Sequence, residues 1–145
     1  MCNLVYFSTT SEEDLAQLSS SVIRMRAPDD SDDESLLDLL AHPSRWYLES
    51  RYGGCSCHYR HRMYGDPSEF GPLEEWSNED ADDIESTLAA YDLFQRLVAE
   101  GDAVDVLDVW NDTPPEDVRE LFVSLSDVPR ESFRFFEGYR FVFSA

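Results

Sequence analysis

The chain has 145 residues, a formal net charge of −20 and no Lys, so its 11 basic residues are all Arg. This charge argues against direct binding to a nucleic-acid backbone or to an anionic membrane surface, since both require a cationic footprint. Hydrophobic residues make up 42% of the chain, enough for one domain to bury a core without disulfides or metal.

The sequence also bears on the compartment. It contains no apolar run of about 20 residues that could cross a bilayer, and its first residues do not resemble a secretory signal. Its three Cys are an odd number, which does not suit a secreted disulfide framework. We therefore expect a cytoplasmic protein with reduced thiols.

The first third of the chain predicts short elements. The run Leu4 to Phe7 is apolar and β-prone, as in a strand that is covered on both faces. The expected elements are a strand over 2–8, a helix capped by Thr10 or Ser11, a short strand over 22–25, an acidic loop over 28–34 and a helix over 35–41.

The middle third predicts a hairpin and then the longest helix. Strands over 45–51 and 55–62 flank Gly53 and Gly54, and residues 64–77 form an irregular loop. The helix over 78–100 has a cap at Ser77 or Asn78, acidic first turns, an apolar stripe and a terminating Gly101.

The last third predicts strands only. They cover 103–110, 120–126, 132–136 and 139–144, and the last two form a hairpin around Glu137 and Gly138. The whole order favours one α+β domain over 1–145. We expect a mixed or antiparallel sheet with one long and two shorter helices packed against it.

The strongest local anomaly is a basic island over residues 42–65. It holds all three His, four Arg and two Cys, against the single acidic residue Glu49. If residues 55–62 are extended, alternate side chains share a face. One face then carries Cys55, Cys57, Tyr59 and His61, and the other carries Ser56, His58, Arg60 and Arg62.

The second of these faces predicts a site for a small anion. Arg and protonated His match a carboxylate, a phosphate or an acidic protein surface. The competing interpretation is a structural one, in which these cations pair with the protein's own abundant carboxylates.

The thiols allow three interpretations. Cys55, Cys57 and His58, with His61 or with Cys2 from a neighbouring strand as a further ligand, offer ligand types that suit zinc. Because the chain has only one close Cys pair, we favour free thiols that act as small buried apolar groups, with no metal and no cofactor. A thiolate enzyme that uses His58 or His61 is the third possibility.

Two acidic residues in the predicted strand 103–110 are further candidates. Asp108 would share a face with Trp110 near the end of that strand, where binding residues often gather. For Asp105 and Asp108 we prefer a structural role, with an Arg partner such as Arg134 or Arg140.

Three parts of the chain resemble a set of small acidic bacterial proteins without established function. They are the opening segment from Met1 to Thr10, the Gly54–Cys57 segment with Arg60 downstream, and the helix over 79–100 before the strand over 104–110. The resemblance implies no activity.

The sequence as a whole predicts an interaction or ligand-binding protein rather than an enzyme. Its acidic surface would meet a basic protein, as small immunity proteins and DNA mimics do. The alternative is a small thiol- or metal-dependent enzyme centred on residues 53–62.

Overall fold

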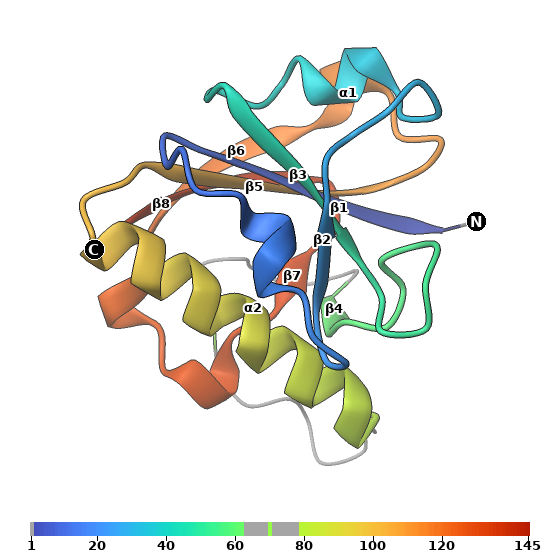
Figure 1. Ribbon diagram of the computed structural model, residues 1–145. Coiled ribbons are helices and arrows are strands. Elements are labelled where there is room, and N and C mark those ends of the chain that lie inside the picture. The colour runs from blue at the N-terminus through green and yellow to red at the C-terminus, as the bar shows by residue number, and fades with distance from the viewer. Residues whose placement is uncertain (1, 63–69, 71–78) are drawn as a thin grey trace.

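The computed structural model describes residues 2–62, 70 and 79–145, and its largest element is a six-stranded sheet (Figure 1). The strand order is β2-β3-β1-β5-β8-β6, and neighbours are antiparallel except β6 and β8. The strands are β1 (Asn3–Thr9), β2 (Arg24–Arg26), β3 (Ser44–Glu49), β5 (Val104–Trp110), β6 (Arg119–Ser124) and β8 (Tyr139–Ser144).

The remaining elements are shorter, apart from one helix. A second sheet pairs β4 (His61–Arg62) with β7 (Phe135–Phe136) in parallel. The α-helices are α1 (Glu34–Leu37) and α2 (Ala81–Ala99), and 3₁₀ helices cover Leu15–Leu18, Pro115–Asp117, Leu125–Asp127 and Arg130–Ser132. None of the helices within the described ranges is both long and apolar enough to span a membrane.

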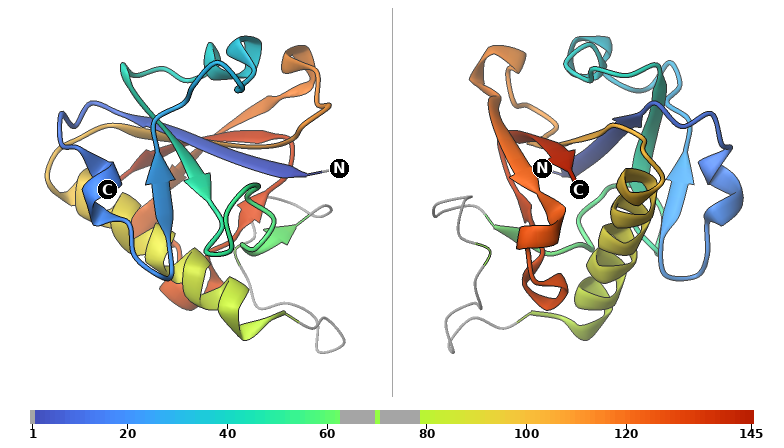
Figure 2. Two further views of the ribbon diagram at one scale, coloured as in Figure 1. Left: turned by 45° about the vertical axis from the view of Figure 1, so that its right-hand side comes forward. Right: turned by 90° about the vertical axis from the view of Figure 1, so that its left-hand side faces the viewer.

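Both faces of the six-stranded sheet are covered. The helix α2 lies across one face, and α1 lies beyond the other (Figures 1 and 2). The strand β1 contributes side chains to both cores because successive side chains point to opposite faces of the sheet. Phe7 packs in the larger core with Phe94 of α2, while Tyr6 packs in the smaller core with Leu36 of α1. The apolar first strand is therefore confirmed, together with its cause.

The strongest sequence patterns are confirmed with small shifts in their bounds. The helix α2 begins after Asp80, whose side chain accepts from the Asp82 amide, so its cap is not Ser77 or Asn78, which lie outside the described residues. Gly101 follows its end with φ +94°, a conformation that favours glycine. The strand β5 is central, between β1 and β8.

The two predicted shorter helices are only single turns. The segment over 35–41 forms one α-helical turn at Glu34–Leu37, and the helix expected after Ser11 is a 3₁₀ turn at Leu15–Leu18. Such short segments gain too few hydrogen bonds to be specified by their own sequence. The predicted loop over 64–77 lies outside the described residues except Phe70, which packs against the larger core.

Both predicted hairpins are wrong. The strand β3 pairs with β1 and β2, and within 55–62 only His61 and Arg62 lie in a strand. The strand β7 pairs with β4, whereas β8 pairs with β5 and β6. Glycine marks where the chain reverses but does not choose the strand's partner. Here Phe135 and Phe136 are buried in the larger core, and their strand takes β4 as its partner.

Candidate metal centre

The Cys-Ser-Cys segment fills a gap beside the first half of β1. The pairing of β3 with β1 begins only at Tyr6. Before that point, the Ser56 amide donates to the Asn3 carbonyl (3.0 Å) and the Val5 amide donates to Ser56 Oγ (2.9 Å). Ser56 Oγ in turn donates to the Leu48 carbonyl of β3. The buried serine replaces missing ladder bonds, and it fixes the flanking cysteines beside the start of β1.

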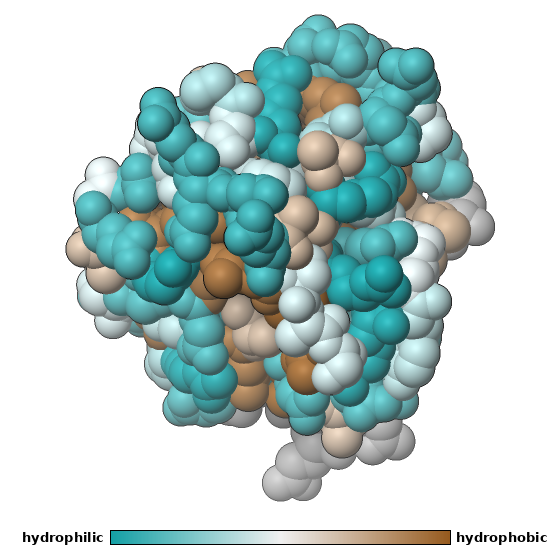
Figure 3. All heavy atoms as spheres, viewed as in Figure 1, coloured by the Kyte–Doolittle hydropathy of each residue, from teal (hydrophilic) through white to brown (hydrophobic). Residues whose placement is uncertain are grey.

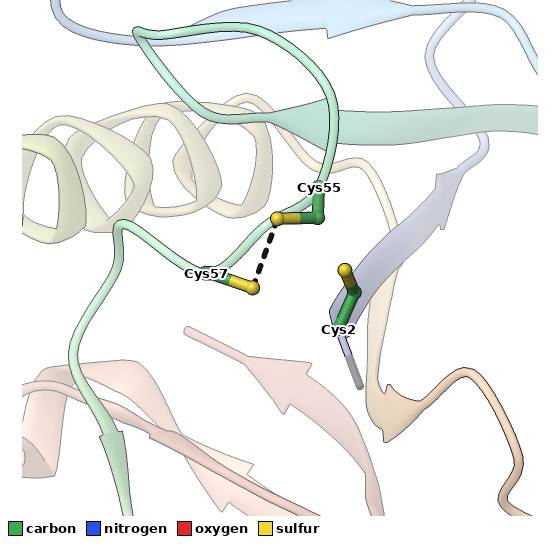
Figure 4. Close-up of side chains that lie close together, drawn as sticks. All are labelled: Cys2, Cys55 and Cys57. Carbon is green, nitrogen blue, oxygen red and sulfur yellow. Dashed lines mark hydrogen bonds between the residues drawn. The ribbon is translucent and has the colours of Figure 1, made fainter.

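Three thiols meet at this place. The sulfur atoms of Cys2, Cys55 and Cys57 lie within 4.8 Å of one another, and those of Cys55 and Cys57 are 2.9 Å apart. Figure 4 shows the two loop cysteines close to Cys2, which lies just ahead of β1. All three are half-buried and none lies in a strand. The structure therefore does not place Cys55 and Cys57 as buried residues on the inner face of a strand.

The cluster shifts the pKa values of its two loop thiols, Cys55 and Cys57, in opposite directions. Burial raises the pKa of Cys55, but hydrogen bonds from the thiol and amide of Cys57 and from the thiol of Cys2 outweigh it, and this pKa lies below its ordinary value. Burial and the neighbouring Cys55 sulfur raise the pKa of Cys57 to about 12. Cys55 is thus the first of the pair to carry a negative charge.

A groove with a volume of about 380 Å³ opens beside these thiols on the α1 side of the sheet. The Arg26 guanidinium lies 4.3 Å from the centre of the Tyr47 ring and pairs with Asp32 at 3.0 Å. The groove is lined by two of the thiol residues, by apolar and aromatic side chains and by charged side chains, which include Cys2, Cys55, Leu4, Tyr6, Tyr47, Arg26, Asp32, Asp33 and Glu49.

A buried ion pair holds the other side of the Cys-Ser-Cys segment. His61 Nε2 lies 2.6 Å from the Ser56 carbonyl oxygen, and Nδ1 lies 2.9 Å from Asp108 Oδ2. The Ser56 carbonyl oxygen can only accept, and a carboxylate does the same, so the geometry suits an imidazolium that donates from both ring nitrogens. Burial lowers the pKa of His61, but the Asp108 carboxylate outweighs it and raises this pKa above its ordinary value.

The structure separates the four residues that were predicted to form an anion site, which are Ser56, His58, Arg60 and Arg62. Ser56 is buried against β1. Arg60 is buried too, and it binds both carboxylate oxygens of Glu79 at 2.7 and 2.8 Å. His58 is half exposed, with Nδ1 3.5 Å from Asp83, and the last of the four lies in β4. They share no outward face, and the competing interpretation of internal pairing describes Arg60 and His58.

The two acidic residues of β5 are buried structural groups. Asp105 accepts from Arg140 Nε at 2.8 Å and from the Ala41 amide at 2.9 Å, which confirms an Arg partner. Asp108 pairs with His61 instead of an arginine. Two features do not follow from the sequence: the insertion of Ser56 between β1 and β3, which we call the Ser56 wedge, and the His61–Asp108 pair. The sequence pointed to them only through a buried strand that contains two aspartates.

Comparison of the chain with protein families, curated proteins and solved structures finds no match.

We predict that the His61–Asp108 pair makes stability fall as the solution becomes alkaline. Because the pKa of His61 is raised in the folded state, its contribution is complete below about pH 6.5 and is lost as pH rises through the folded pKa. His61→Gln should remove this contribution and cost about 3–5 kcal/mol, since one buried charge loses its partner.

Urea unfolding from pH 6 to pH 9 measures both effects. His42→Gln is the matched control, because it replaces a histidine outside this pair. If the parent protein and His61→Gln lost stability with pH equally, the imidazolium assignment would be wrong.

Proposed function

We propose that the protein binds a thiophilic metal ion, with Zn(II) as the reference ion, through Cys2, Cys55 and Cys57. The observation that supports this is the convergence of three thiols from two distant segments of the chain. Thiolates favour zinc, copper(I) and iron–sulfur clusters over harder cations. Three protein ligands are also the number that zinc keeps in sites with an open position.

The geometry needs little adjustment to hold such an ion. Zinc–sulfur bonds of about 2.3 Å in a tetrahedral arrangement place two sulfurs ~3.8 Å apart. The Cys55–Cys57 pair, now at 2.9 Å, would open by ~0.9 Å, and the other separations already lie under 4.8 Å. Rotation of the two side chains provides this change while Ser56 keeps the loop in place.

The surroundings favour a cation over an anion. The groove beside the thiols carries the carboxylates of Asp32, Asp33 and Glu49, of which Asp32 pairs with Arg26 and Glu49 lies 3.9 Å from Arg24, so one negative charge is in excess. A cleft dominated by one sign of charge raises the local concentration of the opposite ion. From the sequence alone, the spacing of Cys55 and Cys57 disfavours a metal site. The position of Cys2 beside them in the structure favours one.

We expect protein that is purified without chelator to bind one Zn(II) per chain. Replacing any one of the three cysteines with Ser should lower the affinity by more than about 100-fold, since the loss of a group that merely orients a ligand costs about 10–100-fold. Affinity should also fall as pH is lowered, because the thiols must release their protons. Elemental analysis and competition with a chromogenic chelator measure these effects.

A control variant keeps the number of thiols constant. Cys2→Ser combined with Ser126→Cys retains three thiols but moves one to an exposed position outside the cluster. Zinc binding by this variant as tight as in the parent protein, or no zinc binding by the parent, would contradict the proposal.

We further propose that the protein is cytoplasmic and that its acidic surface engages a basic protein partner, in the manner of immunity proteins or DNA mimics. Figure 3 shows a face that is covered mainly by hydrophilic residues. At the start of α2 the side chains of Asp82 and Glu85 are 50% and 60% exposed, although both lie near Arg51. With 31 acidic and 11 basic residues, internal pairing leaves a large excess of carboxylates.

We predict that the triple change Asp82→Asn, Asp83→Asn and Glu85→Gln weakens binding of a poly-arginine peptide, most strongly at low salt, where exposed charges act over a longer range. The fold should persist, because the helix cap Asp80 is kept. Calorimetric titration at two salt concentrations measures the effect.

The matched control removes three exposed charges elsewhere, with Asp112→Asn, Glu116→Gln and Asp117→Asn. Equal weakening by the two triple variants would show that the charge acts diffusely and that α2 offers no defined surface.

A further inference from the structure

We propose that the groove beside the thiols binds a small aminothiol, whose sulfur occupies the fourth coordination position of the metal ion. This inference rests on the metal site proposed above. It adds a ligand class and a place for that ligand.

Three thiols are one ligand fewer than a zinc ion in a protein normally has. Within residues 2–62, 70 and 79–145, no fourth Cys, His, Asp or Glu joins the three thiols in a common cluster. The nearby imidazole of His61 is not available, because its two nitrogens are held by Ser56 and Asp108. Zinc in proteins is almost always four-coordinate. The described residues therefore leave one position of such an ion open, which an added molecule could occupy.

The lining of the groove indicates the side from which a further ligand could reach the ion. Cys2 and Cys55 line the groove, whereas Cys57 does not. The Cys57 sulfur faces the Asn3 amide instead, and the segment between the two loop cysteines is packed against β1. Two of the three sulfur-bearing residues therefore border the groove, so a further ligand could reach an ion held by the cluster from there.

The softness of the ion and the charge of the groove together favour one class of ligand. An ion that already has three thiolates is soft, and a further sulfur matches it better than a carboxylate oxygen. The sulfur would bind as a thiolate, with its proton released to solvent. Asp32 pairs with Arg26, and Glu49 lies 3.9 Å from Arg24, so with Asp33 the groove keeps one negative charge in excess. This excess disfavours a ligand with a carboxylate and favours one with an ammonium group. At about 380 Å³ the groove has room for a molecule of this size.

The experiment uses the Co(II)-loaded protein, because thiolate-to-cobalt charge-transfer absorption reports each bound sulfur. Cobalt alone should give the absorption of three thiolates. Cysteamine should then raise it in a saturable way, at least about tenfold more tightly than 3-mercaptopropionate, with 2-mercaptoethanol between them. Ethanolamine, which has no thiol, should leave the absorption unchanged.

Three variants test where the aminothiol binds and which charge selects it. Leu4→Trp fills the groove and should weaken cysteamine binding at least about tenfold without changing the affinity for cobalt. Leu18→Trp, at an exposed position away from the groove, is its control. Glu49→Gln should reduce the preference for cysteamine over 3-mercaptopropionate, because it removes one groove charge.

The outcomes separate the two proposals. Absence of charge-transfer absorption with cobalt alone would overturn the metal site, and this inference with it. Normal absorption that no thiol increases would overturn the inference and leave the metal site intact. Unchanged cysteamine binding in Leu4→Trp would overturn the groove as its place, and equal affinities for the three thiols would overturn the aminothiol class.

Discussion

The pairing of β1 along both of its edges is the constraint on which this structure depends. On one edge β5 pairs with β1 over its whole length, from Asn3 to Thr9. On the other edge β3 reaches only to Tyr6, so the amide and carbonyl groups before that point need other partners. Buried backbone groups that lack partners are costly. Ser56 satisfies them, and the thiol cluster is a consequence of that solution.

Buried ion pairs then fix the segments that have little regular structure. Arg60–Glu79 ties the chain after the cysteines to the approach of α2, His61–Asp108 ties it to β5, and Arg140–Asp105 joins β8 to β5. A buried pair adds little net stability compared with apolar packing, but the loss of one partner is expensive. Such pairs therefore select one position for each segment. This explains why residues 50–60 have a defined path although none of them lies in a strand.

The sequence predicted the elements whose patterns are long or uniform. The run at β1, the stripe of α2 and the apolar β5 were all recognised because burial on one or two faces leaves a periodic record. The pairing partners were not predictable, since they depend on contacts between distant residues. Phe135 and Phe136 illustrate this, because the neighbouring glycine suggested a hairpin while their burial required a separate strand pair.

For the site, the sequence supplied the residue types and not their arrangement. An extended segment places Ser56 outward with Arg60, whereas the wedge beside β1 turns Ser56 inward and leaves the two cysteines on a loop. That wedge exists because β3 ends its pairing early, a property of the register between two strands that no local pattern records. The sequence offers Cys2 as a further metal ligand, but only the structure shows that it lies close to Cys55 and Cys57.

The position of the cluster couples ligand binding to the fold itself. Cys2 lies at the entry to β1, and the other two thiols belong to the loop that completes the pairing of β1. An ion that bridges them would join the two segments by metal–sulfur bonds beside the part of β1 that β3 does not pair with. Because the unfolded chain holds no such preformed cluster, the free energy of binding would be added to the free energy of unfolding. The gap between β1 and β3 would thus be closed twice, by the hydrogen bonds of Ser56 and by the ion.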